Sequence, residues 1–227
     1  MNSLSRIVGS AVFVASGVFA ATLLAPADAR ACGGEWYPMM QVDPRIQGTD
    51  KAEDALDEGK TLAAAGSVIR MIPHIRQLDV TKTKIVQRAS RVLALATVRY
   101  DGALPLSLEV PYYAQGTWLG RTDAQRRANL DWATKTLRAI ASARHDDPAA
   151  RTELAEGLAR VDATRGEARG ILEELAKKDL ITSPDGYAVL ATLRERDGDA
   201  EGRRAALDRC KAMSPNAAAC RADTRAS

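Results

Sequence analysis

Between positions 183 and 213, apolar residues recur at the three- and four-residue spacing of amphipathic helices. Ser183 and Pro184 open the first run as a side-chain N-cap followed by proline at the first helical position, where a missing N–H costs nothing. Gly198 interrupts the pattern, and the second run ends at Ser214-Pro215, which can open another helix. This stretch therefore predicts a hairpin of two antiparallel helices and the start of a third.

The same kind of pattern extends over most of the chain. No segment alternates strongly enough to predict a central sheet, so the predicted fold class is all-α. Asp50, with Glu53 three residues later, has the spacing of a capping box and is expected to begin the first helix. That helix is expected to run through Leu56 to Gly66. The other expected helical segments are Ser67 to Leu78 with a kink at Pro73, Thr81 to Tyr100, Asp123 to His145, and a hairpin from Asp147-Pro148 to Lys178.

Key positions of the hairpin recur elsewhere with the same offsets. Around Gly198 these positions are Ala191, Arg194, Arg203, Leu207, Cys210 and Pro215. The same offsets occur upstream at Gly59, Leu62, Gly66, Met71, Ile75 and Leu78. A third window, from Ala155 to Leu175, fits with one extra residue in its turn. A repeat near 34 residues with small and large apolar residues at these offsets resembles the tetratricopeptide repeat (TPR). Arg194 stands where the motif has an aromatic residue, and Met71 and Arg203 stand where it has alanine.

The resemblance implies an α-solenoid of about four helical hairpins over residues 50–227, closed by a C-terminal capping helix. It also implies a concave groove lined by the first helix of each pair, which would hold an extended peptide or the tail of a protein partner. Mapping the groove offsets onto this sequence gives Glu53, Lys60, Glu156, Arg160, Thr192 and Arg196.

Residues 1–31 have the features of a signal peptide. Arg6 supplies the positive region, residues 7–24 are apolar, and Ala29-Arg30-Ala31 matches an A-x-A cleavage site. We therefore expect an exported protein of the periplasm or cell envelope of a bacterium. An uncleaved membrane anchor remains the alternative, because the apolar run approaches the length that spans a bilayer.

The three cysteines suit such a compartment. In the hairpin register of the repeat, Cys210 and Cys220 lie on facing surfaces and are expected to form a disulfide, with two buried thiols as the alternative. Cys32 would then be left over at the predicted new N-terminus, where lipidation would anchor the chain to a membrane; Arg30 and Ala29 depart from the lipobox motif.

Two segments break the helical pattern. Residues 32–49 are expected to be an extended leader whose Trp36 and Tyr37 either bind a partner or cover the first repeat. Residues 101–122 form a long insertion that carries Tyr112, Tyr113 and Trp118. Long loops with aromatic residues often bind partners, although such residues can equally pack on neighbouring helices.

Catalytic chemistry is poorly represented. The chain has two histidines and none of the HExxH, GxSxG or CxxC motifs, which argues against an enzyme and against a metal or other cofactor. A formal net charge of +3 is spread over mixed-sign segments, so no basic face for nucleic acid is expected. The sequence favours a protein–protein interaction module of the envelope, binding an unidentified protein or peptide. A structural, self-associating or lipid-anchored protein is the alternative, followed by a small-ligand receptor or enzyme with its site under the aromatic loop.

Overall fold

The computed structural model describes residues 43–106 and 110–221, which all belong to one compact unit. Within these ranges the chain forms nine α-helices and four short 3-10 helices, and no β-strand is found there. The predicted signal peptide, Cys32, Trp36 and Tyr37 lie outside the described residues. The α-helices are α1 (Pro44–Asp57), α2 (Thr61–Met71), α3 (Lys84–Arg99), α4 (Tyr112–Gln115), α5 (Asp123–Ala143), α6 (Pro148–Leu158), α7 (Arg165–Lys177), α8 (Pro184–Arg196) and α9 (Ala200–Met213).

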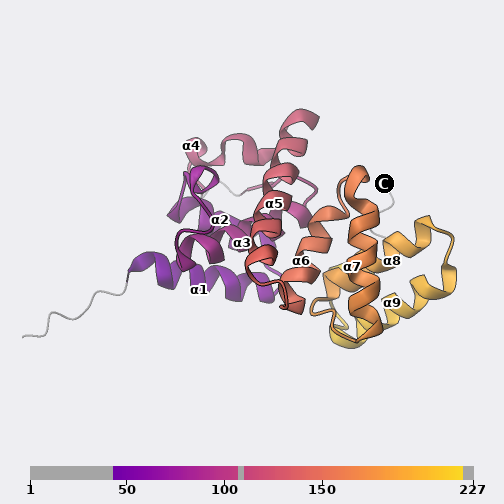
Figure 1. Cartoon of the computed structure of the whole chain (residues 1–227). Coiled ribbons are helices and arrows are strands. Elements are labelled where there is room, and N and C mark those ends of the chain that lie inside the picture. The colour runs from indigo at the N-terminus through magenta and orange to yellow at the C-terminus, as the bar shows by residue number, and fades with distance from the viewer. Residues whose placement is uncertain (1–42, 107–109, 222–227) are drawn as a thin grey trace, which may run out of the picture. The chain divides into compact units, whose positions relative to one another are not determined.

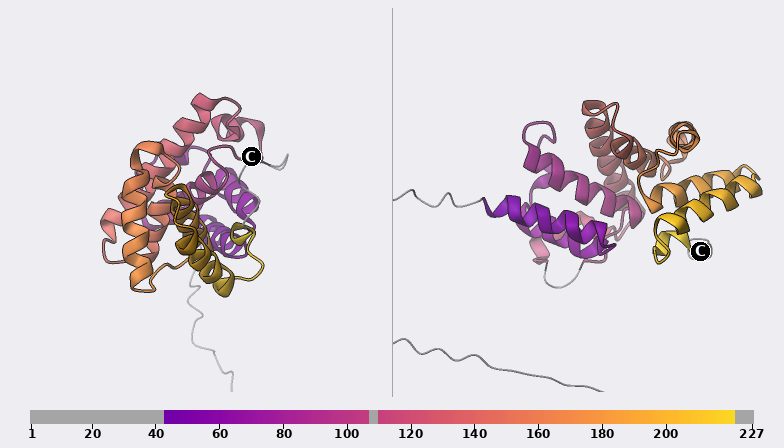
Figure 2. Two further views of the ribbon diagram at one scale, coloured as in Figure 1. Left: turned by 90° about the vertical axis from the view of Figure 1, so that its right-hand side faces the viewer. Right: turned by 90° about the horizontal axis from the view of Figure 1, so that it is seen from below.

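The long helices pack mainly as sequential pairs. α1 lies against α2, α3 against α5, α6 against α7, and α8 against α9, and the pairs follow one another in chain order (Figures 1 and 2). Further contacts of α3 with α1 and α6, and of α6 with α8, join successive pairs. The all-α prediction is confirmed, and so is the arrangement in helical pairs.

The start of the first pair differs from the prediction. α1 begins at Pro44, where the side chain of Asp43 accepts a hydrogen bond from the backbone N–H of Arg45. Asp50 therefore does not cap a helix but lies within α1, and the helix includes residues 44–49 of the expected leader. Asp43-Pro44 is the same cap-and-proline signal that opens α6 and α8, and the capping-box spacing at Asp50 concealed it.

The turn of the first pair lies at Gly59 rather than between Gly66 and Ser67. Gly59 has φ of +77°, which glycine adopts without steric cost. Gly66 instead lies inside α2, where an added Cβ would come within 3.2 Å of Val110. Of the two glycines in the repeat pattern, Gly59 therefore forms a turn and Gly66 allows close packing against Val110. Their spacing in the sequence does not distinguish these two roles.

The insertion between α3 and α5 is partly helical. It contains α4 and the 3-10 helix η2 (Gly116–Leu119), and Trp118 in η2 is buried. The segment closes on itself at Gly120, where φ is +58° and an added Cβ would lie 2.6 Å from the carbonyl oxygen of Gly102. The described residues of the insertion, 101–106 and 110–122, therefore pack against the core around α5.

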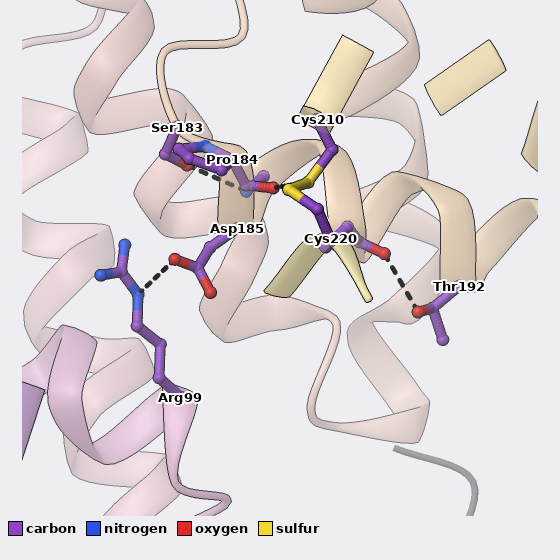
Figure 3. Close-up of a disulfide and its surroundings, with 9 residues drawn as sticks. Arg99, Ser183, Pro184, Asp185, Thr192, Cys210 and Cys220 are labelled. Atoms are coloured by element: carbon purple, nitrogen blue, oxygen red, sulfur yellow. Dashed lines mark hydrogen bonds and ion pairs between the residues drawn. A yellow bond between two sulfur atoms is a disulfide. The ribbon is translucent and has the colours of Figure 1, made fainter. Parts of the chain in front are cut away.

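The last pair is closed by a disulfide. Cys210 on α9 is bonded to Cys220 in the 3-10 helix η4 (Ala218–Cys220), with a Cα–Cα distance of 5.6 Å (Figure 3). This confirms the predicted pairing. η4 is the last helical element among the described residues, so up to Arg221 a single 3-10 turn takes the place of the expected capping helix.

No helix of the described part has both the length and the apolar character needed to cross a bilayer.

Candidate functional site

A cleft of about 340 Å³ lies where α6, α7 and α8 meet. One wall is a single face of α8, whose lining residues are spaced three or four positions apart. The opposite wall comes from the end of α6 and the start of α7, and the turn after α3 completes the rim. The lining residues are Asp101, Ala159, Arg160, Arg165, Val189, Thr192, Leu193 and Arg196.

Three of the six predicted groove residues meet in this cleft: Arg160, Thr192 and Arg196. Arg160 is half-buried just beyond α6, while Thr192 and Arg196 are exposed one turn apart on α8. Thr192 keeps its hydroxyl on the helix, donating to the carbonyl oxygen of Ala188 at 3.0 Å.

Two charged lining residues were missed by the sequence reasoning. Arg165 opens α7 after the 3-10 helix η3 (Asp162–Thr164), which forms the turn of this pair. Asp101 belongs to the insertion and has φ of +50°. The extra residue in the α6–α7 turn relative to the repeat pattern was the only signal of an unusual turn, and none indicated that Asp101 lies beside α8.

The cleft carries an excess of positive charge, with three guanidinium groups and one carboxylate. Arg165 forms an ion pair with the exposed carboxylate of Asp162, while its Nε–H is buried without a hydrogen-bond partner. Among the described residues, Arg196 and Asp101 form no side-chain hydrogen bond or ion pair, and both are exposed. The exposed guanidinium of Arg196 is therefore available to an anionic partner.

Two ion pairs of Arg99 join three helices, two of which also line the cleft. Arg99 on α3 approaches Glu156 on α6 to 3.3 Å. It also approaches Asp185 on α8 to 3.4 Å (Figure 3). Ser183, the N-cap of α8, donates to Glu156 at 2.7 Å. Because these contacts join α3, α6 and α8, they fix the spacing between the helices that form the cleft.

Glu156, a predicted groove residue, is therefore an interior residue. Its side chain is 1% exposed, and desolvation raises the pKa of its carboxyl. Burial alone would lower the pKa of Arg99, but attraction to Glu156 and Asp185 outweighs burial and raises it. The repeat offsets predict that Glu156 lies on a first helix of a pair. They do not predict that Arg99 on α3 forms an ion pair with its buried side chain.

The remaining predicted groove residues lie away from the cleft. Glu53 on α1 accepts hydrogen bonds from Arg88 of α3, whose Nε lies 3.1 Å from both carboxylate oxygens. Lys60 is exposed in the turn between α1 and α2 and pairs with Glu58 at 2.6 Å. Since the turn falls at Gly59, Lys60 does not lie on the helix face that the repeat register assigned to it.

The aromatic residues of the insertion separate into two environments. Tyr112 and Tyr113 on α4 are 77% and 79% exposed, whereas Trp118 is 4% exposed. Arg76 lies over the Trp118 ring at 4.1 Å from its centroid, and Trp132 of α5 contacts Trp118 edge to face. Trp118 thus anchors the loop, and only the two tyrosines present aromatic surface to a partner.

A second hollow of about 420 Å³ lies between α7, α8 and α9. Among its charged groups, Asp179 accepts a hydrogen bond from Tyr187 at 3.1 Å and pairs with Arg209. Arg194 is held by Glu173 and by the carbonyl oxygen of Gly202. The cleft at α6–α8 is the better candidate because three of the predicted groove residues line it.

The described residues contain no cluster of three or more histidine, cysteine or acidic side chains that could hold a metal ion. Comparison with known proteins adds no identification, since no protein-family model, no curated protein and no solved structure matches this chain.

Proposed function

We propose that this protein is an interaction module of the bacterial cell envelope, built as a TPR-like stack of helical pairs, that holds a segment of a protein partner in the α6–α8 cleft. The cleft is the observation that carries the proposal. There, Arg160, Thr192 and Arg196, all assigned to the groove by the repeat offsets, line one hollow.

The export signal in residues 1–31 supports the envelope location, and the disulfide at the end of the helical pairs suits an oxidising compartment. The packing of the walls supports the binding role. Val189 and Leu193 are nearly closed to solvent and lie on the same face of α8 as the exposed Thr192 and Arg196. A cleft with an apolar floor and charged edges suits an extended segment, whose side chains can contact both.

Site-specific photo-cross-linking in cells of the source organism tests the proposal and compares the two candidate surfaces. A photoreactive amino acid replaces Thr192 in the cleft, Tyr113 on the loop, or Arg204 on the exposed side of α9 as a control. We expect one dominant foreign protein at position 192 that is absent at position 204. Cross-links at position 113 alone would transfer the binding role to the loop, and cross-links only within the chain would contradict the proposal.

A further inference from the structure

The charges that line the α6–α8 cleft restrict the chemistry of its occupant; this inference rests on the binding role proposed above. Guanidinium groups bind carboxylates and phosphates through paired N–H donors, so Arg160, Arg165 and Arg196 favour an oxyanion. Carboxylate and phosphate differ in charge, because a phosphate monoester carries about −1.5 to −2 at pH 7. The negative charge already present in the lining can therefore discriminate between them.

That charge belongs to Asp101, whose position is held by the surrounding turn. The next residue, Gly102, has φ of +78° and accepts a hydrogen bond at 2.7 Å from the side-chain amide of Asn129, which is fully buried. Gly102 also lies in close contact with the backbone of Arg126. The carboxylate of Asp101 consequently stays at the rim of the cleft, where it repels a dianion more strongly than a monoanion.

The apolar part of the lining also favours a carboxylate on an aliphatic stem. Val189 and Leu193 occupy positions on α8 adjacent to Thr192 and Arg196, on one face of the helix. The methylene groups of a glutamate side chain can pack on these two residues while its carboxylate reaches the arginines.

We propose that the cleft binds glutamate-rich segments of its partner through their carboxylates, and that Asp101 disfavours phosphorylated segments at the same place. Asp101 then acts as a specificity-determining residue, and Arg196 provides the exposed cation that first meets the segment. The control for general charge is Arg204, an exposed arginine on α9 whose side chain forms no hydrogen bond or ion pair among the described residues.

Fluorescence anisotropy of the purified protein tests this with three labelled peptides of equal length: polyglutamate, polyglutamine and a polyglutamate with phosphoserine at alternate positions. We expect polyglutamate to bind most tightly. Arg196→Ala should weaken it about three- to fivefold, the upper part of the range of an exposed charge contact, while Arg204→Ala changes it less than twofold. Asp101→Asn, which keeps a side chain tolerant of positive φ, should raise affinity for the phosphoserine peptide about fivefold and for polyglutamate much less.

Equal binding of polyglutamine and polyglutamate, or equal losses with Arg196→Ala and Arg204→Ala, would overturn recognition of carboxylates in the cleft. Tighter binding of the phosphoserine peptide by the unmodified protein would overturn the role of Asp101. Either result leaves the cross-linking experiment at position 192 unaffected, so failure of this inference and failure of the proposed function are distinguishable.

Discussion

Arg99 on α3 and Glu156 on α6 form an ion pair 3.3 Å long in the interior, 57 residues apart in the sequence. Asp185 on α8 shares the same guanidinium at 3.4 Å. Desolvation raises the pKa of Glu156, and repulsion from Asp185 adds to the increase. This cluster joins α3, α6 and α8, which makes it a test of the interior packing.

Glu156→Gln is expected to change the pH dependence of stability. Because the folded-state pKa of Glu156 is raised, the folded protein binds this proton more tightly than the unfolded chain does. The unfolding free energy therefore falls as pH rises above the unfolded value of about 4.3 and through the folded pKa, and Gln removes that fall. Urea denaturation across this range should show the unmodified protein losing stability relative to the variant as pH increases. Parallel curves would contradict the buried state of Glu156.

Arg99→Gln is expected to be far more destabilising at neutral pH than Glu156→Gln. It leaves the carboxylates of Glu156 and Asp185 without their shared cation, and removing one partner of a buried pair costs about 3–5 kcal/mol. Chemical denaturation measures the cost, and part of it should return in acid as the carboxylates take up protons. Equal losses for the two variants would mean that Arg99 does not compensate the carboxylates.

The disulfide is expected to stabilise the C-terminal end. Cys210 and Cys220 are ten residues apart, and closing a loop of that size contributes about 2–3 kcal/mol to the free energy of unfolding. Replacing both cysteines with serine should raise amide hydrogen exchange in α9 and η4 more than in α3 and α5. A uniform increase over all helices would show that the bond stabilises the whole unit and not its end.

Arg76 is expected to keep the aromatic insertion in place. Its guanidinium lies over Trp118 and donates to the side-chain oxygen of Asn129, while burial lowers its pKa. Arg76→Ala should lower the unfolding free energy by about 1–3 kcal/mol and expose residues 101–122 to proteases. Limited proteolysis with mass spectrometry locates the cleavage, and Arg70→Ala on the exposed side of α2 serves as the control. Unchanged cleavage of the insertion in the Arg76 variant would argue against this anchoring.

Two glycine substitutions are expected to have opposite signs. Gly120→Ala places a Cβ 2.6 Å from the carbonyl oxygen of Gly102 at positive φ, so it should destabilise the protein. Gly170 lies in the middle of α7 with open space around an added Cβ, so Gly170→Ala should stabilise the protein by about 0.5–1 kcal/mol through its helix propensity. Thermal unfolding compares them directly. The same sign for both would contradict the local geometry described for Gly120.

The helical pairs could be predicted from the sequence because the signals that begin and end their helices are local. Asp147-Pro148 and Ser183-Pro184 open helices through contacts within three residues, and the disulfide joins cysteines only ten residues apart. The register of the first pair could not be predicted as well, because Gly59 and Gly66 both fit the repeat and only tertiary packing against Val110 separates their tasks.

The candidate site was predictable only in part for the same reason. Arg160, Thr192 and Arg196 were found because the groove offsets implied by the TPR resemblance assign them to one surface, and the cleft contains all three. Glu156 fits the same offsets, but its ion pair with Arg99 depends on a residue 57 positions earlier. Asp101 reaches the cleft through the turn after α3, whose location depends on Asn129 and Gly120 and on no spacing within the repeats.

The most direct test of the central claim is cross-linking from position 192 in cells that carry either Arg196→Glu or Arg204→Glu. Both variants change one exposed arginine to glutamate, but only Arg196 lines the cleft. We predict that the cross-linked partner is lost with Arg196→Glu and retained with Arg204→Glu, while circular dichroism shows the same helicity for both. Retention of the same partner with Arg196→Glu would contradict the claim that the charged cleft holds it.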